Sequence, residues 1–216
     1  MSNDELELWV TDELFWDPKV DSAAIAVAAD DGKVTLRGTV GSFREKREAK
    51  KAAERVYGVK SVDNELNVRI LTEYGREDAD LRGDVLQALM LDSLVPATVD
   101  ATVVDGWVTL TGTAAWQFQR EEAEFIAGNV LGVIGVDDLV ELTSPQPRAD
   151  DVAESIEKSF KRDAKLDAEG LTVSTYNGTV SVSGTVHSWA EHDAALDAAW
   201  AAPGVTSVED GILVEY

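Results

Sequence analysis

Pairs of acidic residues stand at one recurring position in this 216-residue chain, and their carboxylates are groups that can do chemistry. Carboxylate oxygens, together with backbone carbonyls, are the ligands that hard cations take in proteins. One hypothesis is a weak cation site at each pair, and the alternative is a polar turn that leads into a strand. The spacing lacks the pattern of a tight Ca²⁺-binding loop. The weak cation candidates are Asp63, Asp137, Asp138, Glu209 and Asp210.

Residues suited to catalysis or tight metal binding are scarce. The chain has no cysteine and two histidines, His187 and His192, which are five positions apart and so do not share a helix face. We expect both histidines to be surface residues. The sequence contains no phosphate-binding loop, nucleophile elbow or zinc-binding histidine motif. We therefore expect no catalytic residue, no assigned metal site, no cofactor and no enzymatic activity.

Three segments of equal length repeat along the chain and contain the acidic pairs. Residues 31–68, 105–142 and 177–214 align without a gap. Each begins with Asp-Gly or Asn-Gly between alternating apolar residues, which is typical of a two-residue hairpin turn. A Ser-x-x-Glu capping box at Ser42 and at Ser188 then predicts a helix start, a glycine predicts the helix end, and another alternating segment predicts a strand. The structural glycines are Gly32, Gly38, Gly58, Gly106, Gly112, Gly132, Gly178, Gly184 and Gly204.

An amphipathic helix is predicted upstream of each hairpin, marked in the first repeat by Leu6, Val10 and Leu14. The pattern therefore predicts an α+β fold of three tandem two-layer αββαβ domains, each a three-stranded mixed sheet packed against two helices. The domains are expected at residues 1–72, 76–143 and 148–216. We expect Gly38 to lie on the buried face of its sheet, where the missing side chain lets a helix approach.

The charge is strongly acidic, with 41 Asp and Glu residues against 19 Lys and Arg residues. Such a surface repels nucleic-acid phosphates, so we expect no nucleic-acid partner. The second helix of the first repeat is nevertheless basic, and the matching helix of the third repeat is acidic. These helices are either solvated faces or surfaces that dock on one another, within one chain or between chains. The interface candidates are charged residues of these two helices and one aromatic residue that we expect to be exposed, Trp107. The charged candidates are Arg44, Arg47, Lys51, Arg55, Glu191, Asp193 and Asp197.

The compartment is expected to be the cytoplasm. The first residues are acidic and lack the basic start and apolar stretch of a secretory signal. No cysteine is available for a lipid anchor, and no apolar run is long enough to span a membrane.

The repeat resembles the BON (bacterial OsmY and nodulation) domain. The resemblance rests on G-x-V-x-(L/V)-x-G-x-(V/A), followed by a helix and G-V-x-x-V-(D/E)-(D/N), and it covers essentially the whole chain as three domains. It implies the αββαβ fold, an association with osmotic or envelope stress, attachment to phospholipid membranes and no enzymatic activity. One cytoplasmic relative, a BON domain joined to a LysM domain, binds potassium. Most tandem BON proteins are exported or lipidated, and this sequence departs from that pattern.

Two functions follow as hypotheses. The first is a non-catalytic binding or assembly protein of osmotic or envelope stress, in which three BON domains present a composite surface to a protein partner, to a second copy or to a lipid surface. The alternative is a cytoplasmic protein that binds or senses a monovalent cation such as potassium. Lipid and cation binding are both expected to be weak.

Overall fold

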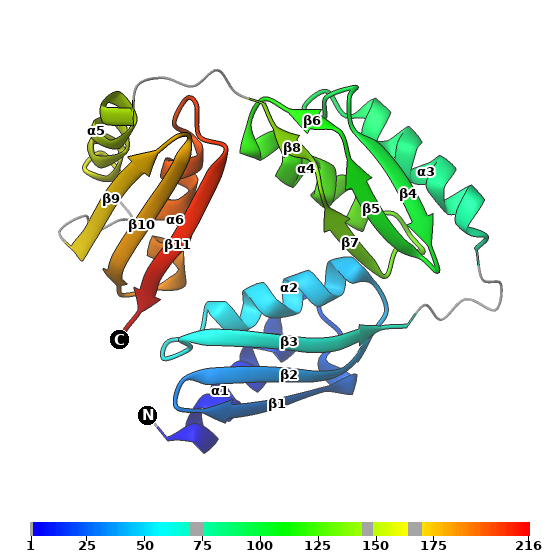
Figure 1. Ribbon diagram of the computed structural model, residues 1–216. Helices are drawn as coiled ribbons and strands as arrows, with labels where there is room; N and C mark the ends of the chain where they lie inside the picture. The colour runs from blue at the N-terminus through cyan, green and yellow to red at the C-terminus, as the bar shows by residue number, and fades with distance from the viewer. Residues whose placement is uncertain (1, 70–75, 144–148, 164–169) are drawn as a thin grey trace. The chain divides into compact units, whose positions relative to one another are not determined.

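The computed structural model describes residues 2–69, 76–143, 149–163 and 170–216 (Figure 1). The predicted boundaries at residues 1, 72 and 148 lie outside the described residues. Each repeat is a helix, a β-hairpin, a second helix and a last strand, as predicted. The chain is therefore an α+β protein of three repeats, each with a three-stranded mixed sheet and two helices.

The first repeat holds two helices on one face of its sheet (Figure 1). Its elements are α1 (Asn3–Trp16), the short helix η1 (Ser22–Ala24), β1 (Ile25–Asp30), β2 (Lys33–Val40), α2 (Phe43–Glu54) and β3 (Ser61–Val68). Strand β2 pairs antiparallel with β1 and parallel with β3, so α2 is the crossover between two parallel strands. The two helices pack against each other as well as against the sheet.

The second and third repeats have the same plan. The second consists of α3 (Asp78–Leu91), β4 (Asp100–Val104), β5 (Trp107–Thr111), β6 (Thr113–Ala114), α4 (Gln117–Gly128), β7 (Gly135–Asp138) and β8 (Glu141–Leu142). The third consists of α5 (Ala149–Phe160), β9 (Leu171–Tyr176), β10 (Thr179–Val186), α6 (Trp189–Trp200) and β11 (Ser207–Val214). In the second repeat the sheet is interrupted, and β6 and β8 form a separate two-stranded pair.

The core of each repeat comes from the residues whose spacing predicted it. In the first repeat Leu6, Val10 and Leu14 of α1 are buried, and so are Val34 and Leu36 of β2. The small residues Ala49, Ala52 and Ala53 of α2 are fully buried against them. Alanines at this spacing let the helix axis come close to the sheet, which explains the narrow apolar stripe of α2.

The hairpin turns adopt the predicted left-handed backbone. Asp31, Asp105 and Asn177 have φ of 47°, 50° and 48°, and each is followed by a glycine with positive φ. Two consecutive residues of positive φ define the turn whose twist matches the strands that it joins. The capping boxes are also confirmed, because the Oγ atoms of Ser42 and Ser188 accept hydrogen bonds from the N–H groups of Glu45 and Glu191.

Gly38 is needed for a reason other than the predicted one. Its φ is +132°, and a Cβ atom there would lie 1.9 Å from the carbonyl oxygen of Ala24. The close neighbour is therefore the backbone just before β1, not the helix that we expected. Gly112 and Gly184 have the same surroundings. A Cβ atom added to them would lie 2.1 Å and 2.0 Å from the carbonyl oxygens of Thr98 and Gly170.

Candidate functional site

The second residue of each pair (Asn64 after Asp63, Asp138 and Asp210) bonds the backbone of the last part of its repeat; Asn64 and Asp210 lie inside β3 and β11, and Asp138 ends β7. An Oδ1 atom of Asn64, Asp138 and Asp210 accepts a hydrogen bond from the backbone N–H two residues further on, at 3.3, 2.9 and 3.0 Å. Asn and Asp side chains commonly bond their own backbone in this way. The acidic pairs do not form the expected polar turn before the last strand, because β3 and β11 run through them and β7 ends at the second pair.

The same side chains also hold the second helix. Asp138 Oδ2 accepts a hydrogen bond from Arg120 Nε at 3.1 Å, and Asp210 Oδ2 lies 2.9 Å from His192 Nε2. In the first repeat, Asn64 Nδ2 donates to the carbonyl oxygen of Lys46 at 2.7 Å. Each bond joins the second helix of its repeat to the last strand. These polar groups therefore hold the crossover helix in place on the sheet.

The remaining cation candidates lie on the outer sides of the sheets. Asp63 is 3.5 Å from Lys33 Nζ, Glu209 accepts a hydrogen bond from Ser181 Oγ at 2.6 Å, and Asp137 is exposed. Within the described ranges, no group of three or more His, Cys, Asp or Glu residues is arranged to hold a metal ion. The cation site stays a prediction, and an ion there would have to compete with Lys33, Arg120 or His192.

His192 differs from the sequence expectation because it is buried, with 7% of its surface exposed. Its Nδ1 lies 3.3 Å from Asp193, its Nε2 bonds Asp210, and its ring packs 4.7 Å from that of Trp189. The hydrogen bond to Asp193 raises the pKa of His192 above its usual value, and Asp210 adds to the effect while burial opposes it. The sequence signal for the role of His192 is its alignment with Arg120, which bonds Asp138, the residue that aligns with Asp210. His187 is exposed, as expected.

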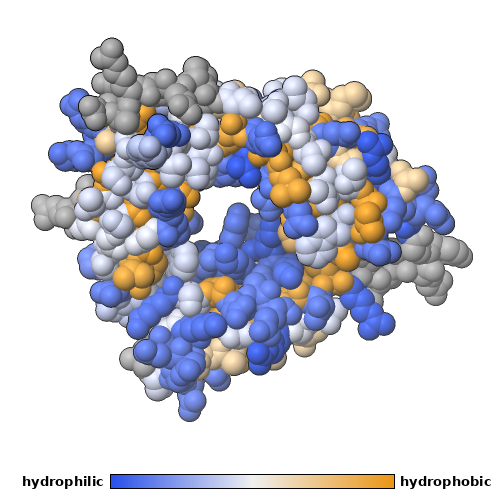
Figure 2. Space-filling model, viewed as in Figure 1, coloured by the Kyte–Doolittle hydropathy of each residue, from blue (hydrophilic) through white to orange (hydrophobic). Residues whose placement is uncertain are grey.

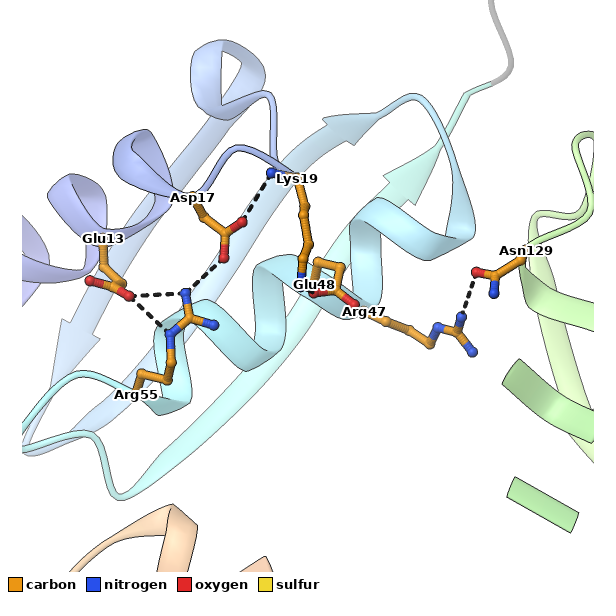
Figure 3. Close-up of polar contacts among 7 residues, drawn as sticks. All are labelled: Glu13, Asp17, Lys19, Arg47, Glu48, Arg55 and Asn129. Carbon is orange, nitrogen blue, oxygen red and sulfur yellow. Dashed lines mark hydrogen bonds and ion pairs between the residues drawn. The ribbon is translucent and has the colours of Figure 1, made fainter. Parts of the chain in front are cut away.

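A network of charges in the first repeat had no sequence signal that we recognised. Arg55 Nη2 lies 2.7 Å from Asp17 Oδ2 and 2.9 Å from Glu13 Oε1, and Lys19 Nζ lies 2.8 Å from Glu48 (Figure 3). Asp17 is buried, and the hydrogen bond from Arg55 holds its pKa below the usual value. These contacts join α1 and the turn after it to α2, so Arg55 is engaged within its own repeat.

The other basic interface candidates on α2 have different surroundings. Arg47 Nη2 bonds Asn129 Oδ1 at 3.1 Å, and its guanidinium lies 5.2 Å from the centroid of Phe125 (Figure 3). Arg44 and Lys51 are exposed, and neither forms an ion pair with any part of the chain that the structure describes. These two exposed cations of α2 are therefore accessible to another molecule.

The acidic candidates on α6 are partly used inside the third repeat. The Oε2 atom of Glu191 accepts a hydrogen bond from the His187 N–H at 3.0 Å, which completes the cap of the helix. Asp193 bonds His192, and Asp197 is exposed. Glu191 and Asp193 therefore have local roles in the third repeat.

Trp107 lies on the outer face of its sheet with 43% of its surface exposed. It pairs with Gly135 of the neighbouring strand, and a Cβ atom on Gly135 would lie 2.6 Å from the indole. The ring therefore covers the glycine backbone of β7. Its exposed part is still suited to an interface, because aromatic side chains are enriched at binding surfaces.

Exposed apolar residues gather on α1, which we did not single out in the sequence. Phe15 and Trp16 are 66% and 77% exposed, and Leu8 and Trp9 on the same helix are also exposed. On the face of the molecule that Figure 2 shows, apolar residues form small patches among hydrophilic ones. The signal in the sequence is the spacing of these four residues, which places them together on the side of α1 away from Leu6, Val10 and Leu14.

No helix among the described residues is long and apolar enough to cross a membrane.

The BON domain model matches residues 2–70, 77–144 and 148–216, and the chain therefore belongs to the BON domain family as three tandem domains. A curated relative is the osmotically-inducible protein Y of Escherichia coli (strain K12), which is 37% identical over 122 residues. That match covers 54% of this chain and 61% of the relative, which is less than two thirds of its length.

Two similar solved structures come from CdsD, a structural protein of the type III secretion system of Chlamydia trachomatis. One covers 98% of this chain and 92% of the other at 14% identity, with a TM-score of 0.28. The other, the C-terminal domain of CdsD, covers 100% of both chains at 14% identity, with a TM-score of 0.27. Scores this low support no conclusion about this chain.

Proposed function

We propose that this chain is a non-catalytic binding and assembly protein of the osmotic stress response. The observation that carries the proposal is where the repeats differ. The residues shared by all three, such as the turn glycines, build the fold, whereas the exposed side chains change from one repeat to the next. Phe15 of α1, for example, aligns with Met90 and Lys161, and all three are exposed.

The relationship to the osmotically-inducible protein Y supports the osmotic part of the proposal. Family membership and that relationship also support a non-catalytic role. We place the protein in the cytoplasm, where fractionation of cells with a specific antibody tests the location.

The functional test is growth under osmotic stress. A strain that lacks the gene should grow more slowly than its parent after a shift to high osmolarity, and a plasmid copy of the gene should restore growth. Equal growth of parent and deletion strain, with the protein shown to be present in the parent, would contradict the proposal.

The surface test asks whether the differing residues act in that role. Complementation with Trp107→Lys should fail or weaken while the protein stays folded by circular dichroism. Lys33, the residue that aligns with Trp107 in the first repeat, supplies a matched control as Lys33→Ala. Full activity of a folded Trp107→Lys variant would remove this residue from the binding surface.

A further inference from the structure

Helix α1 carries apolar residues on two opposite faces. Leu6, Val10 and Leu14 pack into the core. The opposite face holds two rows of residues seven positions apart, which are Leu8 with Phe15 and Trp9 with Trp16, all exposed. Seven residues are nearly two helical turns, so each row runs along the helix.

Two carboxylates lie between these apolar rows. Helical geometry places Glu5 and Asp12 between the Leu8 row and the Trp9 row, again seven positions apart. Both are exposed, and neither forms an ion pair in the part of the chain that the structure describes. We call Glu5, Leu8, Trp9, Asp12, Phe15 and Trp16 the acidic-aromatic face of α1.

Helix α2 carries the matching charges. Arg44 and Lys51 are exposed, have no ion-pair partner among the described residues and are also seven positions apart. At a rise of 1.5 Å per residue, both the acidic pair on α1 and the basic pair on α2 are about 10 Å long. When the two helices lie side by side, each acidic residue of α1 can therefore face one basic residue of α2.

The two surfaces lie side by side in one layer of the first repeat. Helices α1 and α2 cover the same face of the sheet (Figure 1), and the Arg55–Glu13 contact joins α1 to the end of α2 (Figure 3). An acidic stripe beside a basic stripe is self-complementary under a two-fold rotation, which is the symmetry of most homodimers. We propose that a second copy of this chain docks on the first repeat, with α1 of each copy against α2 of the other.

The charge distribution selects this occupant. Helix α1 holds five acidic residues and no Lys or Arg, so contact between two α1 helices or with an anionic surface is repulsive. Indole faces attract Lys and Arg, and aromatic residues with Arg are enriched at the centres of interfaces. Trp9 and Trp16 thus add apolar area and a preference for cations to the same face.

The other repeats lack this combination. In the second repeat, the residues that align with Arg44 and Lys51 are Phe118 and Phe125. In the third repeat they are Ala190 and Asp197. The complementary pair of stripes belongs to the first repeat, so the dimer needs only that repeat from each copy.

This dimer names the partner of the binding role proposed above and rests on that role. The two fail in different ways. Equal growth of the parent and the deletion strain at high osmolarity contradicts the function. A monomer in solution contradicts the dimer and leaves the growth result unchanged.

The experiment is a charge exchange on the full chain, read by light scattering coupled to size-exclusion chromatography. Wild type should be a dimer at an ionic strength of about 0.05 M and should dissociate as salt rises through about 0.5 M. Either Glu5→Lys with Asp12→Lys or Arg44→Glu with Lys51→Glu should raise the dissociation constant by about tenfold or more. The variant with all four changes should recover a dissociation constant within about threefold of wild type.

The matched control is Asp80→Lys with Glu157→Lys, which changes the net charge as much as the α1 variant does and should remain dimeric. Asp80 aligns with Glu5, and Glu157 is exposed on α5. Circular dichroism checks that every variant is folded.

Four results would overturn the proposal: a monomer at all salt concentrations, no recovery in the fourfold variant, dissociation of the control, or wild-type binding to phosphatidylglycerol vesicles that requires Trp16 while the chain stays monomeric. Loss of the dimer in Trp9→Ala with Trp16→Ala would support it.

Discussion

The Nε2 atom of His192 on α6 lies 2.9 Å from Asp210 Oδ2 in the middle of β11. This single contact joins the second helix of the third repeat to its last strand. Arg120 and Asp138 make the equivalent contact in the second repeat. Arginine keeps its charge at all physiological pH values, whereas histidine does not. The strength of this contact between helix and strand therefore depends on pH in the third repeat and not in the second.

We predict that acidification from about pH 8 to about pH 6 stabilises the third repeat through His192. The pKa of His192 is raised in the folded state. Its contribution is therefore complete below the unfolded pKa and is lost as pH rises through the folded pKa. His192→Gln should lose roughly 1–3 kcal/mol at about pH 6 and less at about pH 8.

Urea unfolding of wild type and His192→Gln at several pH values measures this effect. The difference between their free energies of unfolding removes the general response of an acidic protein to pH. His187→Gln is the control, because His187 is exposed. A difference that stays constant with pH would mean that His192 is neutral in the folded protein.

We predict that Gly38→Ala destabilises the first repeat by about 2 kcal/mol or more. The residue has φ of +132°, and the added Cβ would meet the Ala24 carbonyl oxygen. Gly83→Ala is the matched change in helix α3, where a Cβ meets nothing within 4 Å, and it should stabilise by up to about 1 kcal/mol. Thermal and urea unfolding of both variants would show opposite signs, and equal effects would contradict this account of Gly38.

We predict that Arg55→Ala destabilises the first repeat by roughly 1–3 kcal/mol, because it leaves the buried carboxylate of Asp17 without its cation. The pKa of Asp17 is lowered in the folded state, so its contribution is present above the unfolded pKa and is lost as pH falls through the folded pKa. The variant should therefore differ most from wild type near neutral pH and least in acid. Lys46→Ala, on the helix that Arg55 caps, should change stability by less than about 0.5 kcal/mol.

We predict that Gly135→Ala moves the Trp107 ring away from β7. The added Cβ would lie 2.6 Å from the indole, so the ring must move toward solvent. The expected result is a red shift of Trp107 emission, measured in a variant whose other tryptophans are replaced by phenylalanine. An unchanged spectrum would show that the ring already lies off the glycine in solution.

The potassium hypothesis makes a separate prediction. The carboxylates of Asp138 and Asp210 already face Arg120 and His192, so Asp138→Asn should lower the melting temperature equally in KCl and NaCl. Melts of wild type at equal ionic strength provide the comparison, since an ion that binds only the folded state raises its stability. Greater stability of wild type in KCl, abolished by Asp138→Asn, would favour a cation site.

The amino-acid sequence by itself determined the three repeats, the hairpin turns and the buried residues of the helices. These features are local: Asp31 and Gly32 need positive φ, Ser42 caps the helix that follows it, and Leu6, Val10 and Leu14 recur at the helical period. The partner of each polar side chain was decided by tertiary structure. His192 and Asp210 are 18 positions apart, and Gly38 meets a backbone carbonyl from before the preceding strand. Such pairings depend on how the crossover helix packs across its sheet, which the spacing of residues along one segment does not specify.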